Sequence, residues 1–159
     1  MFEKILVPLD GSPLAATILP EVEDLAKSQK SEITLLTVSN APSTAILAEA
    51  GAAIIDPILR WRKNSAEEYL KETTKTLTAK GLKVCWAYRE GAPAREVLRY
   101  ADEARCDLIA MATHGRGEIA WVLGSVAEQV VSHATVPVLL MRVLKGQPLM
   151  KKQDLMSGP

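Results

Sequence analysis

The chain has 159 residues, enough for one domain with a full hydrophobic core and too few for two domains of ordinary size. Its 19 basic and 19 acidic residues balance, so the sequence offers no basic field to hold nucleic acid or an anionic membrane. Hydrophobic residues make up 48% of the chain and are dispersed, which indicates a globular protein, and no apolar stretch is long enough to span a bilayer.

The first half of the chain alternates apolar runs with amphipathic stretches. Residues 4–10 (KILVPLD) and 32–39 (EITLLTVS) are short runs without polar alternation, which is typical of strands buried on both faces. Residues 13–29 and 57–79 carry apolar side chains at steps of three and four, which predicts helices. The Ala-rich segment 39–55 has no clear period, and we expect a long loop with some helical turns there.

The second half continues the same alternation. Residues 82–90, 106–113 and 136–143 are further apolar runs that predict strands. Residues 93–104 and 125–134 each have one apolar face and predict helices. Residues 145–159 contain glycine and proline without a sustained period, so we expect a domain of residues 1–144 followed by a flexible tail.

The predicted helices carry terminal signals. The first helical position is proline in three of them, at Pro13, Pro57 and Pro93. Ser125 and Glu128 have the spacing of a capping box at the start of the last helix. Gly81 lies where a helix C-cap is expected.

Strands that alternate with helices predict an α/β fold, a doubly wound, Rossmann-like open sheet of five parallel strands with helices on both faces. Two strand orders are plausible, 3-2-1-4-5 and 2-1-3-4-5, and ligands bind where the order reverses. The strands at 4–10 and 106–113 both end in glycine and polar residues, and Pro137 favours an edge position for the strand at 136–143. We therefore predict the order 3-2-1-4-5, with a crevice between the first and fourth strands.

The loop that follows the fourth strand has the properties of an anion site. Gly115 and Gly117 let backbone amides approach an anion closely, and Gly124-Ser125 opens a helix whose N-terminus carries partial positive charge. Asp10, across the crevice, is placed to accept hydrogen bonds from ribose hydroxyls. The sequence thus predicts a bound nucleotide, with its sugar near Asp10 and its phosphates near Gly115, Gly124 and Ser125.

Each of these features also has a simpler structural interpretation. A turn alone would account for Gly115 and Gly117, and a turn with an N-cap would account for Asp10. The capping box explains Ser125 whether or not a phosphate binds. Arg116 either contacts a phosphate or faces water, and the three tryptophans are interpreted as packing residues rather than stacking platforms, at Trp61, Trp86 and Trp121.

Three segments together resemble the universal stress protein family: KILVPLDGS at 4–12, LIAMATHGRG at 108–117 and LGSVAEQVVSHATVPVLLMR at 123–142. The resemblance covers residues 2 to about 143 and implies the predicted sheet order and a dimer. One branch of that family binds ATP through a pattern of Gly, two residues, Gly, nine residues, then Gly-Ser or Gly-Thr. The nucleotide-binding residues that it implies here are Pro8, Leu9, Asp10, Val38, Met111, Ala112, Gly115, Arg116, Gly117, Gly124, Ser125 and Val126.

The sequence departs from that pattern twice. Ala112 replaces the first glycine, a small change unless the backbone there needs a positive φ. Eight residues separate Gly115 from Gly124, one fewer than in the family pattern, which shortens the phosphate loop.

Two functions remain open from the sequence. The first is an ATP-binding regulatory protein of the stress response, with Mg²⁺ bridging the phosphates. The second is a nucleotide-free dimeric interaction module, which Ala112 and the short loop favour. Both predict a homodimer through the apolar edge strand at 136–143. No general base, metal triad or nucleophile pair is visible in the sequence, so we expect at most slow ATP hydrolysis. The absence of G-x-x-x-x-G-K-[ST] and of G-x-S-x-G argues against a P-loop NTPase and a serine hydrolase.

Two further expectations concern the compartment. Residues 1–12 lack the pattern of a secretory signal, so we expect a cytoplasmic protein. Cys85 and Cys106 form no C-x-x-C pair, and we expect two buried, reduced thiols. A disulfide or a redox pair is the alternative.

Overall fold

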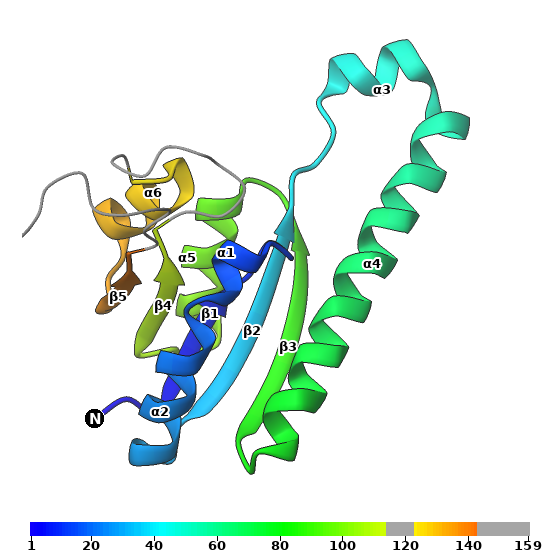
Figure 1. Cartoon of the computed structure of the whole chain (residues 1–159). Coiled ribbons are helices and arrows are strands. Elements are labelled where there is room, and N and C mark those ends of the chain that lie inside the picture. The colour runs from blue at the N-terminus through cyan, green and yellow to red at the C-terminus, as the bar shows by residue number, and fades with distance from the viewer. Residues whose placement is uncertain (114–122, 143–159) are drawn as a thin grey trace, which may run out of the picture.

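The computed structural model describes residues 1–113 and 123–142. Its five strands form one parallel sheet in the order β3-β2-β1-β4-β5, which confirms the predicted order (Figure 1). The strands are β1 (Lys4–Pro8), β2 (Glu32–Ser39), β3 (Lys83–Glu90), β4 (Leu108–Ala112) and β5 (Val138–Met141). The described chain contains no helix long and apolar enough to cross a membrane.

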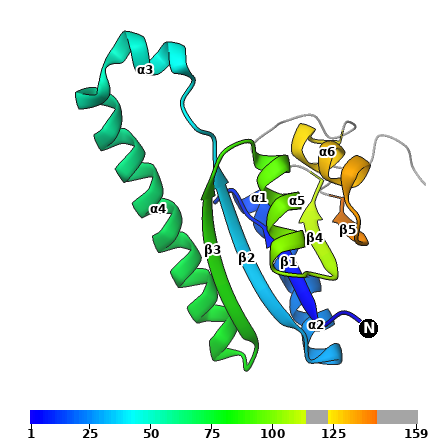
Figure 2. The same ribbon diagram turned by 180° about the vertical axis from the view of Figure 1, so that it is seen from behind.

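Helices cover both faces of the sheet, as predicted. The helices are α1 (Pro13–Ala16), α2 (Leu19–Gln29), α3 (Thr44–Ala50), α4 (Ala52–Ala79), α5 (Pro93–Glu103) and α6 (Ser125–His133). Buried side chains of α1, α2 and α4 join one core cluster, and those of α5 and α6 join a second cluster on the opposite face (Figures 1 and 2).

The strand residues divide between the two clusters by alternation. Ile5 and Val7 of β1 belong to the α2 and α4 side, whereas Leu6 belongs to the α5 and α6 side. All three are fully buried, and each contributes roughly 1.5–3 kcal/mol through its removal from water. Burial on both faces explains why the strand sequences are continuously apolar rather than alternating.

The helix predicted over 13–29 is two helices. Ser12 caps α1, as its hydroxyl accepts a hydrogen bond from the Ala15 amide, and α1 ends at Ala16. Pro20 lies in the first turn of α2 and has no amide hydrogen to donate to the Ala16 carbonyl. A single continuous helix is therefore interrupted at Thr17 and Ile18.

The segment 39–55, predicted as a long loop with some helical turns, is helical over most of its length. Residues 44–50 form α3, capped by the Ser43 hydroxyl, and α4 begins at Ala52 rather than at Pro57. Pro57 therefore lies inside α4, where it cannot donate to the carbonyl of Ala53. Ala53 is exposed, so that carbonyl can bond to water instead.

Together α3 and the first half of α4 project beyond the carboxyl ends of the strands (Figures 1 and 2). We call this segment, residues 44–60, the arm. It buries only Ile55, and α3 buries no residue at all. Its sequence therefore lacks the apolar period that a core-facing helix would show, which is why the prediction missed it.

The expectation of two buried thiols was correct for one cysteine. Cys106 is buried and Cys85 is exposed, and both are free. β3 is an edge strand, and the side of it that carries Cys85 lies opposite the face packed against α4. Because helices cover that outer part of the sheet incompletely, an apolar run there does not guarantee burial.

Candidate functional site

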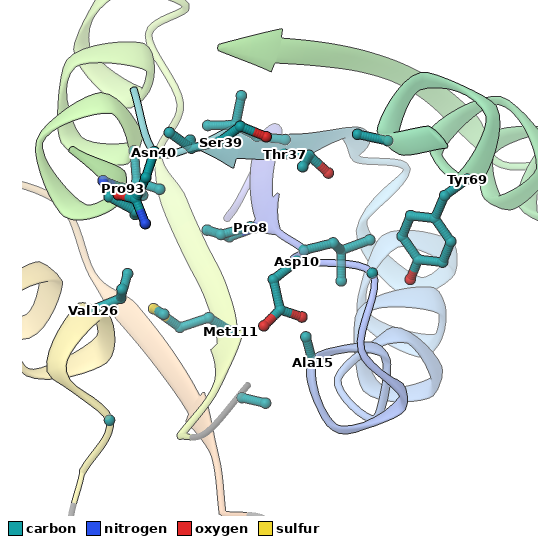
Figure 3. Close-up of a pocket in the computed structure, with 18 of the residues that line it drawn as sticks. Pro8, Asp10, Ala15, Thr37, Ser39, Asn40, Tyr69, Pro93, Met111 and Val126 are labelled. Atoms are coloured by element: carbon teal, nitrogen blue, oxygen red, sulfur yellow. The ribbon is translucent and has the colours of Figure 1, made fainter. Parts of the chain in front are cut away.

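A cavity of about 810 Å³ opens at the carboxyl ends of β1, β2 and β4. The first residues of α5 and α6 and one face of α4 complete its walls (Figure 3). Nine of the predicted nucleotide-binding residues line it: Pro8, Leu9, Asp10, Val38, Met111, Ala112, Gly124, Ser125 and Val126. The other three, Gly115, Arg116 and Gly117, lie outside the described residues, as do Trp121 and the tail at 145–159.

Asp10 lies near the middle of the cavity because a tight turn follows β1 (Figure 3). The Leu9 amide donates to the Leu36 carbonyl over 2.8 Å, which extends the pairing with β2 to the cavity edge. The Ser12 amide then donates to Oδ1 of Asp10 over 2.9 Å, across Gly11, whose φ is 78°. The turn interpretation of Asp10 is thus correct, and the turn also holds its carboxylate in the cavity.

Ala112 occupies its position without strain. It is the last residue of β4 and pairs with Met141 of β5. Within residues 1–113 and 123–142, the non-glycine residues with positive φ are Lys30 and Arg105, so Ala112 does not need the freedom of glycine. Replacement of the family's first glycine by alanine therefore leaves this part of the backbone compatible with the fold.

The start of α6 differs from the capping box predicted for Ser125 and Glu128. Gly124 is the N-cap, since its carbonyl accepts from the Glu128 amide over 2.9 Å, and no side chain caps the helix. Ser125 is instead the first helical residue, and a side chain there is one position too late to bond the first-turn amides as a cap.

This shift changes which backbone amides are free at this end of the cavity. The Gly124 amide donates to the Thr113 carbonyl over 2.9 Å, so it is used within the fold. The amides of Ser125, Val126 and Ala127 are in the first turn of α6 and have no acceptor inside the helix. All three residues line the cavity. Among the described residues at this end of the cavity, the amides without an acceptor inside the helix are therefore those of the first turn of α6, and the Gly124 amide is not among them.

One wall of the cavity was not predicted. It is a face of α4 that contributes Trp61, Arg62, Ser65, Ala66 and Tyr69. The side chains at 61, 65 and 69 recur every fourth residue, which places them on one helix face. The spacing of these residues could be recognised in the sequence, but no sequence feature indicated that this helix face borders the cavity.

Trp61 contradicts the interpretation of the tryptophans as packing residues. It is 69% exposed at the cavity wall, whereas Trp86 packs against the core as predicted. Arg62 and Asp10 are the charged side chains among the described lining residues. The described chain shows no ion pair for Arg62.

Tyr69 and Thr37 place hydroxyl groups on the same side of the cavity (Figure 3). Burial raises the pKa of the Tyr69 phenol, hydrogen bonding with Thr73 lowers it, and the charge of Asp10 raises it again. Thr37 is 5% exposed, and its hydroxyl has no hydrogen-bond partner among the described residues. No group of three or more histidine, cysteine, aspartate or glutamate side chains in the described chain is arranged to hold a metal ion.

The model of the universal stress protein family matches residues 1–142, so the chain belongs to this family. Universal stress protein MJ0531 from Methanocaldococcus jannaschii is 31% identical over 92% of this chain and 86% of its own length. The solved structure of MJ0577 from the same organism is 28% identical, with a TM-score of 0.74, over 92% of this chain and 99% of that one.

Two structures with lower identity contain nucleotides. One is a universal stress protein in complex with cAMP, with a TM-score of 0.63 and 22% identity over 89% of this chain and 97% of that one. The other is the universal stress protein from Archaeoglobus fulgidus in complex with dAMP, with a TM-score of 0.61 and 18% identity over 87% of this chain and 96% of that one. At these identities the two structures share the fold with this chain.

Proposed function

We propose that this universal stress protein is an adenine-nucleotide-binding regulatory protein of the stress response, and that it holds ATP in the cavity between β1 and β4. The observation that carries the proposal is the pairing of two features across one cavity: the first-turn amides of α6 on one side and the Asp10 carboxylate in the middle. The amides and the helix dipole favour phosphate oxygens, and a carboxylate accepts hydrogen bonds from ribose hydroxyls.

The nucleotides in two proteins of the same fold support this proposal, since cAMP and dAMP both contain adenine, a sugar and phosphate. Asp10 is the one carboxylate among the described lining residues, and these residues include no histidine, cysteine or lysine. That set favours binding over fast turnover. We therefore propose a cytoplasmic sensor whose contacts change with nucleotide occupancy, with Mg²⁺ held by the phosphates rather than by a protein cluster.

Calorimetric titration with ATP and Mg²⁺ tests the proposal, with Asp10→Asn as the informative variant. Asparagine keeps the Oδ1 acceptor for the Ser12 amide but removes the charge, so the turn persists while ribose binding weakens. We expect about tenfold weaker ATP binding. Asp24→Asn, at an exposed position in α2 outside the cavity, is the matched control and leaves affinity unchanged. Equal affinity of the wild type and Asp10→Asn would remove Asp10 from the site.

The alternative function, a nucleotide-free dimeric module, would use the exposed edge of the sheet, as would a nucleotide-binding dimer. β5 pairs only with β4 in the described sheet, and Leu139 on it is 38% exposed. We propose that β5 pairs with a second copy of the chain whether or not a nucleotide is bound.

A further inference from the structure

The wall that α4 contributes to the cavity continues into the arm. Trp61, Ser65 and Tyr69 line the cavity from one face of α4. Two isoleucines alone give no apolar period, but the helix that begins at Ala52 places Ile54 and Ile58 in line with Trp61, at steps of four and three residues. Ile54 is 62% exposed and Ile58 is 50% exposed. These two side chains, which we call the stripe, lead from the cavity wall out along the arm.

The α4 wall of the cavity is itself exposed. Trp61 is 69% exposed although it lines the cavity, so water reaches the wall beside it. The cavity opens at the carboxyl ends of the strands, and the arm projects beyond those same ends (Figures 1 and 2). Sites for small molecules normally enclose most of the ligand's surface. A segment that closed over the α4 side of the cavity would complete the enclosure of a ligand, and the arm is the segment that lies next to it.

The arm is attached to the domain in a way that allows it to move. Ile55 is the buried residue of the arm and belongs to neither core cluster, so the arm is not anchored in the core. At one end, residues 40–43 form neither helix nor strand. At the other end, Pro57 leaves the Ala53 carbonyl without its helical donor, and helices bend sharply at such positions. Residues 44–56 are thus joined to the domain at two points where the backbone can turn with little loss of packing.

Occupancy of the cavity decides whether closure of the arm is favourable. Over a cavity filled with water, the stripe would remain in contact with water and would gain nothing. Over a bound ligand, the stripe is removed from water, which favours the closed position. A ligand shifts such an equilibrium only by binding the two states unequally, and the contact with the stripe supplies that difference.

We propose that the arm is a lid, which bends at residues 40–43 and at Pro57 and closes the stripe over the occupied cavity. This inference rests on the proposed function, because the nucleotide is the ligand whose binding closes the lid. It assigns the change of contacts with occupancy to one movement: the arm projects from the empty protein and is folded onto the domain in the nucleotide complex.

Paired spin labels measure this movement directly. They are attached at Glu49→Cys on α3 and Gln129→Cys on α6, two exposed positions, in the full chain with Cys85→Ser. Cys106 is buried and should remain unlabelled at neutral pH. ATP with Mg²⁺ should shift the distance between the labels to shorter values and slow amide exchange in residues 44–56.

Ile54→Ser tests whether the stripe drives the closure. The variant should lose the ATP-induced shortening and should release ATP about tenfold faster, with an unchanged association rate. Asp56→Ser is the matched control, because Asp56 is also exposed but lies on the opposite side of the helix, two residues further on. This control should close and release ATP as the wild type does.

Two results would decide against the lid, and calorimetric titration with ATP separates them. If the wild type binds ATP while the label distance stays unchanged and Ile54→Ser releases ATP at the wild-type rate, the lid is overturned and the proposed function stands. If the wild type does not bind ATP at millimolar concentration, the proposed function is overturned, and the lid with it.

Discussion

At the scale of single residues, the two thiols differ in environment and therefore in chemistry. Burial raises the pKa of Cys106 to about 11, and the charge of Lys4 only partly opposes this. Cys85 is exposed on β3, where its Sγ lies 3.1 Å from Oγ1 of Thr34. At mildly alkaline pH, iodoacetamide should alkylate Cys85 in the folded protein and leave Cys106 intact, because the thiolate is the reactive form. Peptide mass spectrometry checks this, and equal labelling of both thiols would contradict the burial of Cys106.

The same raised pKa of Cys106 links stability to pH. The folded-state pKa of about 11 exceeds the unfolded value near 9, so the unfolded chain loses this proton first. The contribution is complete below about pH 9 and is lost as the pH rises toward about 11. Urea unfolding of wild type and Cys106→Ala across this interval should show a shallower pH dependence in the variant. A steeper or equal dependence would show that this thiol does not titrate as described.

Residue by residue, the sequence predicted the parts of the site that follow strands. Asp10 was identifiable because the carboxyl ends of parallel strands meet at one edge of a sheet, whereas Val38 and Met111 followed only from the resemblance to the universal stress protein family. The position of Trp61 at the cavity and the unpaired Thr37 hydroxyl were not identifiable, since they depend on how α4 leans over that edge and on which hydroxyl lacks a partner among the described residues. Neither property has a local sequence signal.

At the scale of elements, α4 has two halves that differ in what they bury. The second half buries Leu70 and Leu77 against the sheet, whereas the arm buries only Ile55. Isolated short helices are marginal in water, and local stability follows buried apolar contact. In hydrogen–deuterium exchange, peptides from 44–58 should therefore exchange faster than peptides from 66–79. Equal protection of the two segments would mean that the arm is covered in solution.

Element prediction succeeded where burial imposed a period and failed where it did not. β2 was predicted with its observed bounds, and α5 to within one residue, because both face the core along their length. The break after α1 depends on Pro20, which an amphipathic pattern alone does not reveal. The arm has no apolar period from which a helix could be predicted. Pro57 was interpreted as the first residue of a helix, but it lies inside α4, where a proline is tolerated because that turn of the helix is exposed to water.

At the scale of the whole molecule, the exposed apolar residues gather in two places. Apart from Met1, one group is Leu139 and Val131 on β5 and α6. The other lies on the arm, at Ile46, Leu47, Ile54 and Ile58, and continues to Trp61, three residues beyond Ile58 in α4. We propose the β5 edge as the homodimer contact because unpaired strand groups there can continue the sheet.

Light scattering at micromolar concentration tests this assembly. The wild type should have the mass of a dimer, and Leu139→Lys should shift it toward the monomer by placing a charge in the contact. Ile46→Lys adds the same charge on α3, where the side chain is 54% exposed, and should leave the dimer intact. Dissociation by Ile46→Lys with no effect of Leu139→Lys would place the contact on the arm instead.

The central claim is that one cavity holds a nucleotide, with its phosphates at the first turn of α6 and its sugar at Asp10. A crystal structure of the full chain grown with ATP and Mg²⁺ tests it most directly. The account predicts phosphate oxygens within hydrogen-bond distance of the amides of Ser125, Val126 and Ala127, and ribose hydroxyls at Asp10. A cavity that contains no nucleotide at saturating ATP, or a nucleotide bound elsewhere on the chain, would contradict it.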